Sequence, residues 1–364
     1  MKRFVILLLI ITILIILQTQ GCKKSKILIL PNPEEATNTP DIQATQTETA
    51  FETMTATHTP IETITASYTP TVGCTPVNFP DPNLEAAIRK AIGKPTGVIC
   101  QTDCESIVSL DASNFFITDL TGIEYCINLT ELNLYNNNIS DIGPLSGLTK
   151  LKHLSLRTNN ISDISPLAGL TNLTELYLTS NNISDISALS SLVNLTYLDI
   201  SFNSISDISP LAGLINLTTL DLWNDNISDI SPLAGLTNLT VLYLTSNNIS
   251  DISPLSGLTD LKRLYLDSNN INNINVLSSL TNLTHLDISF NNISDISPLA
   301  GLINLTVLYL TSNNISDITA LVTNCDAGGL GSGDFVNLQS NPLSTQATTV
   351  DIPYLESKGV LVSY

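Results

Sequence analysis

Charged residues are scarce in this sequence, and basic residues are the fewest among them. Only 13% of the 364 residues are charged, whereas soluble globular proteins usually carry roughly 25%. Lysine and arginine together number 14 against 33 acidic residues, which gives a formal net charge of −19 at pH 7. Nucleic acids and anionic membrane surfaces are bound by clustered basic side chains. We therefore predict that the protein has no nucleic-acid partner.

Histidine and the aromatic residues are also few. The chain has one tryptophan, eight phenylalanines and ten tyrosines although 43% of its residues are hydrophobic, so its core must be mainly aliphatic. Its three histidines are His58, His153 and His285, which are too far apart in the sequence to build a Ser/His/Asp or Cys/His set. A glycine-rich phosphate loop is also missing from the sequence. These absences predict a protein that is not an enzyme and that binds no cofactor.

Residues 1–22 have the features of an export signal. A positively charged start is followed by an apolar run that ends at Leu17. A membrane-spanning helix needs about 20 residues, so we expect cleavage, with an uncleaved anchor extended to Leu30 as the alternative. The pair Gly21-Cys22 resembles the end of a bacterial lipoprotein signal, although the two residues before it depart from that motif. The resemblance implies a lipid on Cys22 and a location on the outer side of the cell envelope, or else secretion.

Residues 23–78 differ from the rest of the chain in composition. Threonine and proline recur in this segment, and no leucine occurs between Pro31 and Asn83. A segment with so little to bury cannot offset the entropy cost of ordering its backbone. We expect a disordered, extended stalk, whose composition also permits O-glycosylation.

From residue 110 to about residue 329 the sequence repeats every 22 residues, in ten units. Each unit carries the pattern Leu-x-Leu-x-x-Asn, in which Phe115 and Asp225 replace the asparagine in two units. The asparagines of the other units are Asn137, Asn159, Asn181, Asn203, Asn247, Asn269, Asn291 and Asn313. The segment Leu132-Asn133-Leu134-Tyr135-Asn136-Asn137-Asn138-Ile139 resembles the core of the leucine-rich repeat, in which two leucines point inward from a short strand.

This resemblance implies an α/β solenoid. The expected form is a curved, right-handed superhelix with a parallel β-sheet on its concave side and short 3-10 or α turns on its convex side. In the turn Ser165-Pro166-Leu167 the serine is placed to cap and the proline suits the first helical position. Residues 79–109 predict a helical N-terminal cap, which also resembles the caps of bacterial surface leucine-rich repeat proteins. Residues 330–364 predict an irregular last repeat and a C-terminal cap.

Three positions of each repeat should face the concave surface, and the first of them is the residue before the first leucine. The central column is the residue between the two leucines, and the flanking column is the residue after the second leucine. Tyrosine and tryptophan are enriched in binding hot spots, and several of them occur in these columns between aspartates. The residues predicted to bind a ligand are Tyr177, Asp199, Asp221, Trp223, Tyr243, Tyr265, Asp267, Asp287 and Tyr309.

The predicted ligand is a protein or a glycan. The repeats resemble those of internalin-type adhesins, and this resemblance implies protein recognition or adhesion. In the alternative interpretation, the aromatic residues were merely copied with the repeats, and the chain is a structural scaffold of the cell envelope with weak or self-contacts. The low diversity among the repeats favours this second function.

A second file of aspartates should lie on the other side of the solenoid. Its members are Asp119, Asp141, Asp163, Asp185, Asp207, Asp229, Asp251, Asp295 and Asp317. A single file does not bring six to eight oxygens to one point as Ca²⁺ requires, so no metal site is predicted. Each aspartate is expected to accept hydrogen bonds from backbone amides of its own turn.

The sequence contains six cysteines. With a lipid on Cys22, the other five form an odd set in an oxidising compartment. One disulfide is plausible among Cys100, Cys104 and Cys126, but the sequence does not say which pair forms. Cys126 is equally compatible with a buried free thiol.

Overall fold

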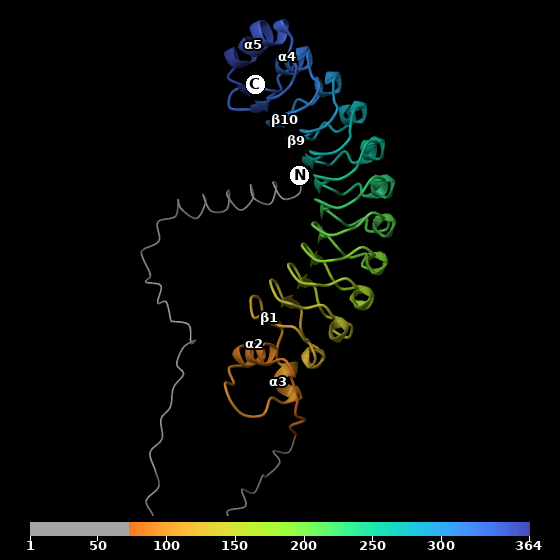
Figure 1. Cartoon of the computed structure of the whole chain (residues 1–364), viewed down its shortest axis with the longest axis vertical. Helices are drawn as coiled ribbons and strands as arrows, with labels where there is room; N and C mark the ends of the chain where they lie inside the picture. Colours follow the sequence, from red (N-terminus) through yellow and green to blue (C-terminus); the bar gives the residue numbers. More distant parts are fainter. Residues whose placement is uncertain (1–72) are drawn as a thin grey trace, which may run out of the picture. The chain divides into compact units, whose positions relative to one another are not determined.

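The structure is a computed structural model that describes residues 73–364. Twelve parallel strands form one sheet in which each strand pairs with its neighbours in the sequence. The strands are β1 (Ser109–Asp111), β2 (Glu131–Asn133), β3 (His153–Ser155), β4 (Glu175–Tyr177), β5 (Tyr197–Asp199), β6 (Thr219–Asp221), β7 (Val241–Tyr243), β8 (Arg263–Tyr265), β9 (His285–Asp287), β10 (Val307–Tyr309), β11 (Phe335–Asn337) and β12 (Leu361–Ser363). The sheet lines the inner side of the curved stack, as the sequence predicts (Figure 1).

Short helical turns connect the strands along the outer side of the stack (Figure 1). The 3-10 turns are η1 (Ile123–Tyr125), η2 (Gly143–Leu145), η3 (Ser165–Gly169), η4 (Ser187–Ser191), η5 (Ser209–Leu211), η6 (Ser231–Gly235), η7 (Ser253–Gly257), η8 (Asn275–Ser279) and η9 (Ser297–Leu299). The other helices are α2 (Pro82–Ile92), α3 (Gln101–Glu105), α4 (Thr319–Asp326), the π-helical turn η10 (Ala347–Asp351) and α5 (Ile352–Ser357). Within residues 73–364 no helix has the length and apolar character needed to cross a membrane.

Aliphatic side chains at equivalent positions of every repeat fill the interior. Leu154 and Leu156 are fully buried, and Leu154 pairs in register with Leu132 and Leu176 on the neighbouring strands. Since the register is one whole repeat, leucine stacks on leucine along the solenoid. One leucine or isoleucine at each of these positions is enough to fill the narrow interior. This explains why the chain needs so few aromatic residues.

An asparagine ladder closes the corner after most strands. The side-chain amide of Asn159 donates to the carbonyls of Leu134 and Leu156 at 3.0 and 3.1 Å, and its Oδ1 accepts from the backbone N–H of Ile139 at 3.0 Å. The residue before it, Thr158, is in the left-handed region at φ 55°. The amide thus satisfies buried backbone groups that the corner removes from the strand ladder.

The convex aspartates stabilise the turns that follow the corners. Oδ1 of Asp163 accepts from the backbone N–H of Ser165 at 2.8 Å, and the same contact recurs between Asp229 and Ser231. This confirms the predicted role of the aspartate file. The prediction that Ser165 caps its turn is wrong, because the turn begins at Ser165 itself and the serine is therefore a donor inside the turn.

Helices α2 and α3 precede β1, where the sequence predicts a helical cap. Asp81 is the N-cap of α2. Its Oδ1 accepts from the backbone N–H of Asn83 at 2.8 Å, and its Oδ2 accepts from the backbone N–H of Thr118 at 2.7 Å. The side chain of Leu84 in α2 is fully buried in the same core as the repeats. The helical segment and the first repeat therefore share one interior.

The disulfide prediction needs correction. Cys100 pairs with Cys74, whereas among residues 73–364 Cys104 and Cys126 are free and buried. The backbone explains the pairing, because an antiparallel bridge joins Pro76 to Cys100 and brings the two sulfur atoms together. The expectation of a free buried Cys126 is confirmed.

Two predicted features fall on residues that the structure does not describe. These are the export signal with its lipid attachment at Cys22, and the stalk from residue 23 up to residue 72.

At the C-terminal end of the solenoid, α4 takes the place of a 3-10 turn and the repeat length changes, so that Tyr309 of β10 pairs with Asn337 of β11. Helix α5 and strand β12 complete the chain.

Candidate functional site

The concave face of the sheet carries the predicted ligand-binding residues. In the central column Asp221, Tyr243, Tyr265 and Asp287 are each in register with the next across strands β6 to β9. Trp223 belongs to the flanking column and leaves 42% of its surface exposed. Tyr177, Tyr309 and Asp267 lie in the same two columns and reach solvent. The register therefore brings the predicted residues other than Asp199 onto one face of the sheet.

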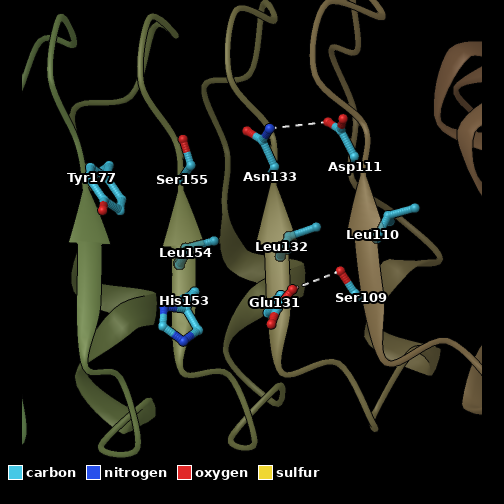
Figure 2. A pocket seen from close by; sticks show the side chains of 10 residues that line it. All are labelled: Ser109, Leu110, Asp111, Glu131, Leu132, Asn133, His153, Leu154, Ser155 and Tyr177. Carbon is cyan, nitrogen blue, oxygen red and sulfur yellow. Dashed lines mark hydrogen bonds between the residues drawn. The ribbon is translucent and has the colours of Figure 1, made fainter.

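The N-terminal part of this face is hollowed. One hollow of about 420 Å³ lies over β1 to β4, where serine and asparagine side chains leave room beside Tyr177 (Figure 2). Its polar groups bond to one another, since Ser109 donates to Glu131 at 3.0 Å and Asn133 donates to Asp111 at 3.1 Å. A second hollow of about 560 Å³ beside it is lined by Asn133, Tyr135, Ser155, Arg157, Thr158, Tyr177 and Thr179.

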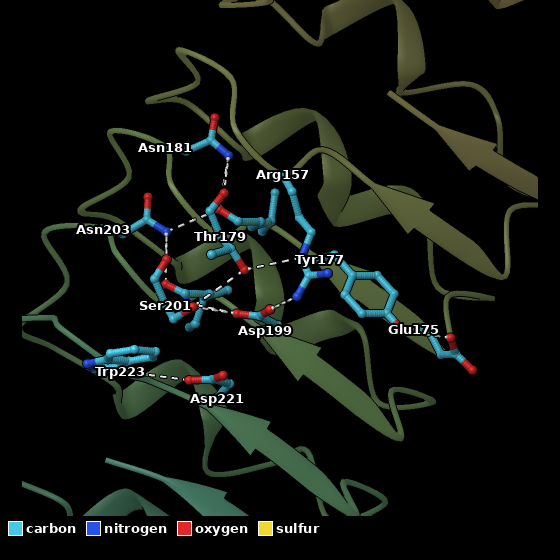
Figure 3. Close-up of polar contacts among 12 residues, drawn as sticks. Arg157, Glu175, Tyr177, Thr179, Asn181, Asp199, Ser201, Asn203, Asp221 and Trp223 are labelled. Carbon is cyan, nitrogen blue, oxygen red and sulfur yellow. Dashed lines mark hydrogen bonds and ion pairs between the residues drawn. The ribbon is translucent and has the colours of Figure 1, made fainter. Parts of the chain in front are cut away.

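Among the predicted ligand-binding residues, Asp199 is the one whose side chain is buried. It is only 1% exposed, because Arg157 reaches across from two strands away and its Nη2 lies 2.5 Å from Oδ2 of Asp199 (Figure 3). Ser201 donates its hydroxyl to the other carboxylate oxygen at 2.7 Å. A partner at this point meets the Arg157 guanidinium, which also lies 4.9 Å from the centre of the Tyr177 ring.

Four aromatic pairs lie along the concave face, and one of them joins Tyr309 to Phe335 with ring centres 5.4 Å apart. Tyr243 and Tyr265 stack with ring centres 4.7 Å apart and an angle of 9° between the rings. Tyr177 packs against Tyr197 at 4.8 Å, and Phe202 meets the edge of Trp223 at 4.7 Å. Tyr197 and Phe202 were not among the residues predicted from the sequence. The signal for Phe202 is its position, since it is an exposed phenylalanine at φ 54° where most repeats have a small polar residue.

The remaining concave carboxylates lack a cationic partner. Among residues 73–364 the ion pairs are Arg89–Glu85, Lys94–Asp103, His153–Glu175 and Arg157–Asp199. Burial raises the pKa of Asp221 to about 6, and repulsion from the Asp199 carboxylate adds to this effect. Burial also raises the pKa of Asp267 and of Asp287, although hydrogen bonds from Thr245 and Ser289 oppose it. The centre of the concave face is therefore negatively charged, partly desolvated and uncompensated.

The described residues show no group that could serve as a metal centre. No three histidine, cysteine or acidic side chains converge anywhere in residues 73–364. His153 lies on β3 beside Glu175, and His285 lies on β9 beside Thr284. The surface offers aromatic faces, carboxylates and one paired guanidinium, which are groups suited to binding.

Family models match most of the repeat region. The model described as Leucine Rich repeats (2 copies) matches residues 105–147, 127–169, 149–191, 171–212, 193–235 and 281–323, and the model described as Leucine rich repeat matches residues 215–271. Together these segments cover more than half of the chain. The chain belongs to the leucine-rich repeat family.

Solved structures relate the chain to bacterial internalins. An internalin, InlF, from Listeria monocytogenes is 37% identical with a TM-score of 0.68, over 80% of this chain and 93% of that one. Internalin C2 from the same organism is 40% identical with a TM-score of 0.57, over 61% of this chain and 97% of that one. The functional domain of InlJ, also from Listeria monocytogenes, is 29% identical with a TM-score of 0.62, over 73% of this chain and 56% of that one. The predicted resemblance to internalins is confirmed, whereas no curated protein matches the chain.

Proposed function

We propose that this internalin-like chain is a non-enzymatic, extracellular module that recognises a protein partner through its concave face. The observation that carries the proposal is the exposed side chain of Trp223, which packs against Phe202 on the same face of the sheet as the Tyr243–Tyr265 stack. Large aromatic side chains give much contact area at a low entropy cost and dominate protein-binding hot spots. A soluble domain that needed them only for its core would bury them.

The proposed location follows from the first residues of the chain. Residues 1–22 have the pattern of an export signal, and Cys22 is the proposed lipid attachment site. The threonine-rich segment from residue 23 would then separate the repeat domain from the membrane. This arrangement would leave the concave face free to meet a partner outside the cell.

A site-specific photo-crosslinker tests the proposal. The full chain would carry p-benzoylphenylalanine in place of Tyr243 on the concave face, and a control chain would carry it in place of Thr237, which is exposed in the loop before β7. Illumination with an extract of cell-surface proteins should give one saturable adduct for position 243 and none for position 237. Trp223→Ala with Tyr265→Ala should reduce that adduct at least about tenfold, since each removes a large contact of the kind found in hot spots.

The competing function, a structural scaffold of the envelope, predicts a different adduct. In that case position 243 would crosslink only to a second copy of the chain, and the low diversity of the repeats would be sufficient to explain the surface. Equal labelling of positions 237 and 243, or an adduct that survives the double substitution, would overturn recognition through the concave face.

A further inference from the structure

Strands β6 to β9 place an acid, two stacked tyrosines and a second acid in one row. Asp221 is in register with Tyr243, Tyr243 with Tyr265, and Tyr265 with Asp287. We call these four residues the acid–tyrosine row. Neighbouring strands are about 4.8 Å apart, so the two carboxylates stand about 14 Å from each other.

Neither carboxylate of the row is neutralised by its surroundings. Within residues 73–364, Oδ1 of Asp221 accepts only from the backbone N–H of Trp223 at 3.0 Å (Figure 3), and Oδ1 of Asp287 accepts from that of Ser289 at 3.0 Å. By contrast, Asp199 in the neighbouring strand is paired with Arg157. Keeping a partly desolvated, unpaired carboxylate charged costs free energy, and this cost falls when a cation binds to it.

The charged and titratable groups around the row do not supply that cation. Those facing Asp221 are Asp199 and Tyr197 on β5, Tyr243 on β7, Asp225 after its own strand, and the Arg157 that Asp199 holds. Those around Asp287 are Tyr265, Arg263 and Asp267 on the β8 side, Tyr309 on β10 and His285 on its own strand. Arg263 is exposed and forms no ion pair within residues 73–364.

We propose that the acid–tyrosine row docks a basic segment of the partner protein, with one lysine or arginine at Asp221 and another at Asp287. This inference rests on the proposed function and names the chemistry of the partner. The stacked tyrosine rings offer faces over which a cation is attracted. In an extended segment, two basic residues four positions apart are separated by about 13–14 Å, which matches the spacing of the two carboxylates.

A neutral or acidic segment fits the row poorly. Docking of a neutral segment would bury Asp221 further without a compensating charge, and docking of an acidic segment would add repulsion. The net charge of −19 for the chain strengthens the attraction of a basic partner at long range. Charge complementarity therefore selects the occupant of this surface.

Trp223 allows docking to be observed directly, because it is the only tryptophan in the chain and its backbone N–H binds Asp221. The probe is a glycine–serine peptide with arginines at positions i and i+4, and its control is the same peptide with citrulline, which is nearly isosteric and uncharged. Each would be titrated at low salt and pH 7.5 into the full chain in a mild non-ionic detergent. The tryptophan fluorescence should change saturably, and the arginine peptide should reach half-saturation at a concentration at least about tenfold lower than the citrulline peptide.

Substitutions then locate the binding to the row. Asp221→Asn and Asp287→Asn should each weaken binding of the arginine peptide by about three- to tenfold, since each substitution removes one of two ion pairs. Asp229→Asn is the matched control, because this aspartate lies in a convex turn and an asparagine there keeps the acceptor for Ser231. Lowering the pH from 7.5 to 5 should weaken binding about tenfold in the wild type and much less in Asp221→Asn, because protonation of Asp221 removes its charge.

The outcomes separate this inference from the proposed function. Equal binding of the two peptides, or full affinity after Asp221→Asn, would overturn the basic-segment proposal. If position 243 still crosslinks to a saturable partner in that case, recognition through the concave face stands with a partner of other chemistry. If the arginine peptide binds as expected and position 243 crosslinks to no protein, the row binds cations and the proposed function falls.

Discussion

At position 225 a carboxylic acid occupies a corner that is built for an amide. In the next repeat the amide of Asn247 donates to the carbonyls of Leu222 and Leu244 at 2.8 and 3.1 Å. Asp225 keeps the acceptor half of this arrangement, since its Oδ1 accepts from the backbone N–H of Ile205 at 3.1 Å. Its Oδ2 is buried and has no hydrogen-bond partner among residues 73–364. Burial, with smaller contributions from Asp221 and Asp199, raises the pKa of Asp225 to about 7.

Asp225→Asn should therefore stabilise the fold, and more so at high pH. The folded pKa of about 7 exceeds the ordinary value of 3.8, so the native state binds the proton more tightly than the unfolded chain. The contribution of Asp225 is fully favourable below about pH 4 and is lost as the pH rises through 7. We expect a gain of roughly 2–4 kcal/mol at pH 8 and a much smaller gain at pH 4, measured by urea unfolding.

A reverse substitution one repeat away is the matched control for this prediction. Asn247→Asp creates the same defect in the next corner and should lower stability at pH 8 by a similar amount. If Asp225→Asn left the urea midpoint at pH 8 unchanged or lowered it, the asparagine ladder would not be the source of stability at this corner.

The burial of Asp199 shows the limit of sequence reasoning at this scale. The column that contains Asp199 follows directly from the repeat, but its partner Arg157 lies 42 residues away, two repeats earlier. Only a long side chain can cross the intervening strand, and it can do so because that strand presents the small Thr179 in the flanking column. The repeat pattern predicts which side chains share a face, whereas contacts between non-adjacent repeats depend on side-chain length and on gaps.

At the scale of the element, most convex turns depend on one aspartate, and Asn273 takes its place at η8. Asp251 accepts from the backbone N–H of Ser253 at 2.8 Å through Oδ1 and from its hydroxyl at 2.9 Å through Oδ2. The backbone hydrogen bond from Ser253 lowers the pKa of Asp251. The strand and turn of each repeat are thus predictable from a 22-residue pattern, but the residue that supports the turn is the aspartate and not the serine.

Asp251→Ala should lower the thermal midpoint slightly, by about 1–2 °C, because one hydrogen-bonded turn loses its acceptor. Asp251→Asn keeps an acceptor and should remain closer to the wild type, as measured by circular dichroism. Since the folded pKa lies below 3.8, the advantage of the wild type is present above this pH and is lost as the pH falls through the folded value. Equal effects of the two substitutions at pH 7 would contradict this role.

At the scale of the whole molecule, the stack is stabilised by contacts between neighbouring repeats, so damage at one end should stay local. The Cys74–Cys100 disulfide closes a loop of 26 residues before the first repeat. Sequence spacing alone does not predict this pair, because Cys74 follows a stretch of threonine-rich composition and meets Cys100 only through an antiparallel bridge.

Reduction of this disulfide should destabilise the helical segment by about 3 kcal/mol, the loop-closure entropy expected for its length. Hydrogen exchange should speed up in residues 76–105 and change little in strands β5 to β10. Cys325→Ser serves as a control, because this free cysteine lies at the other end of the stack. A uniform rise in exchange along the whole solenoid would show that the stack unfolds as one unit.

The two buried thiols make it possible to measure how often α3 separates from the first repeat. Cys104 and Cys126 occupy equivalent places one repeat apart, as shown by the backbone hydrogen bonds that Ile107 and Leu129 donate to their carbonyls. Both thiols are completely shielded from solvent. A thiol reagent can therefore reach them only while α3 is lifted from η1, and the rate of labelling measures how often this joint opens in the otherwise intact protein.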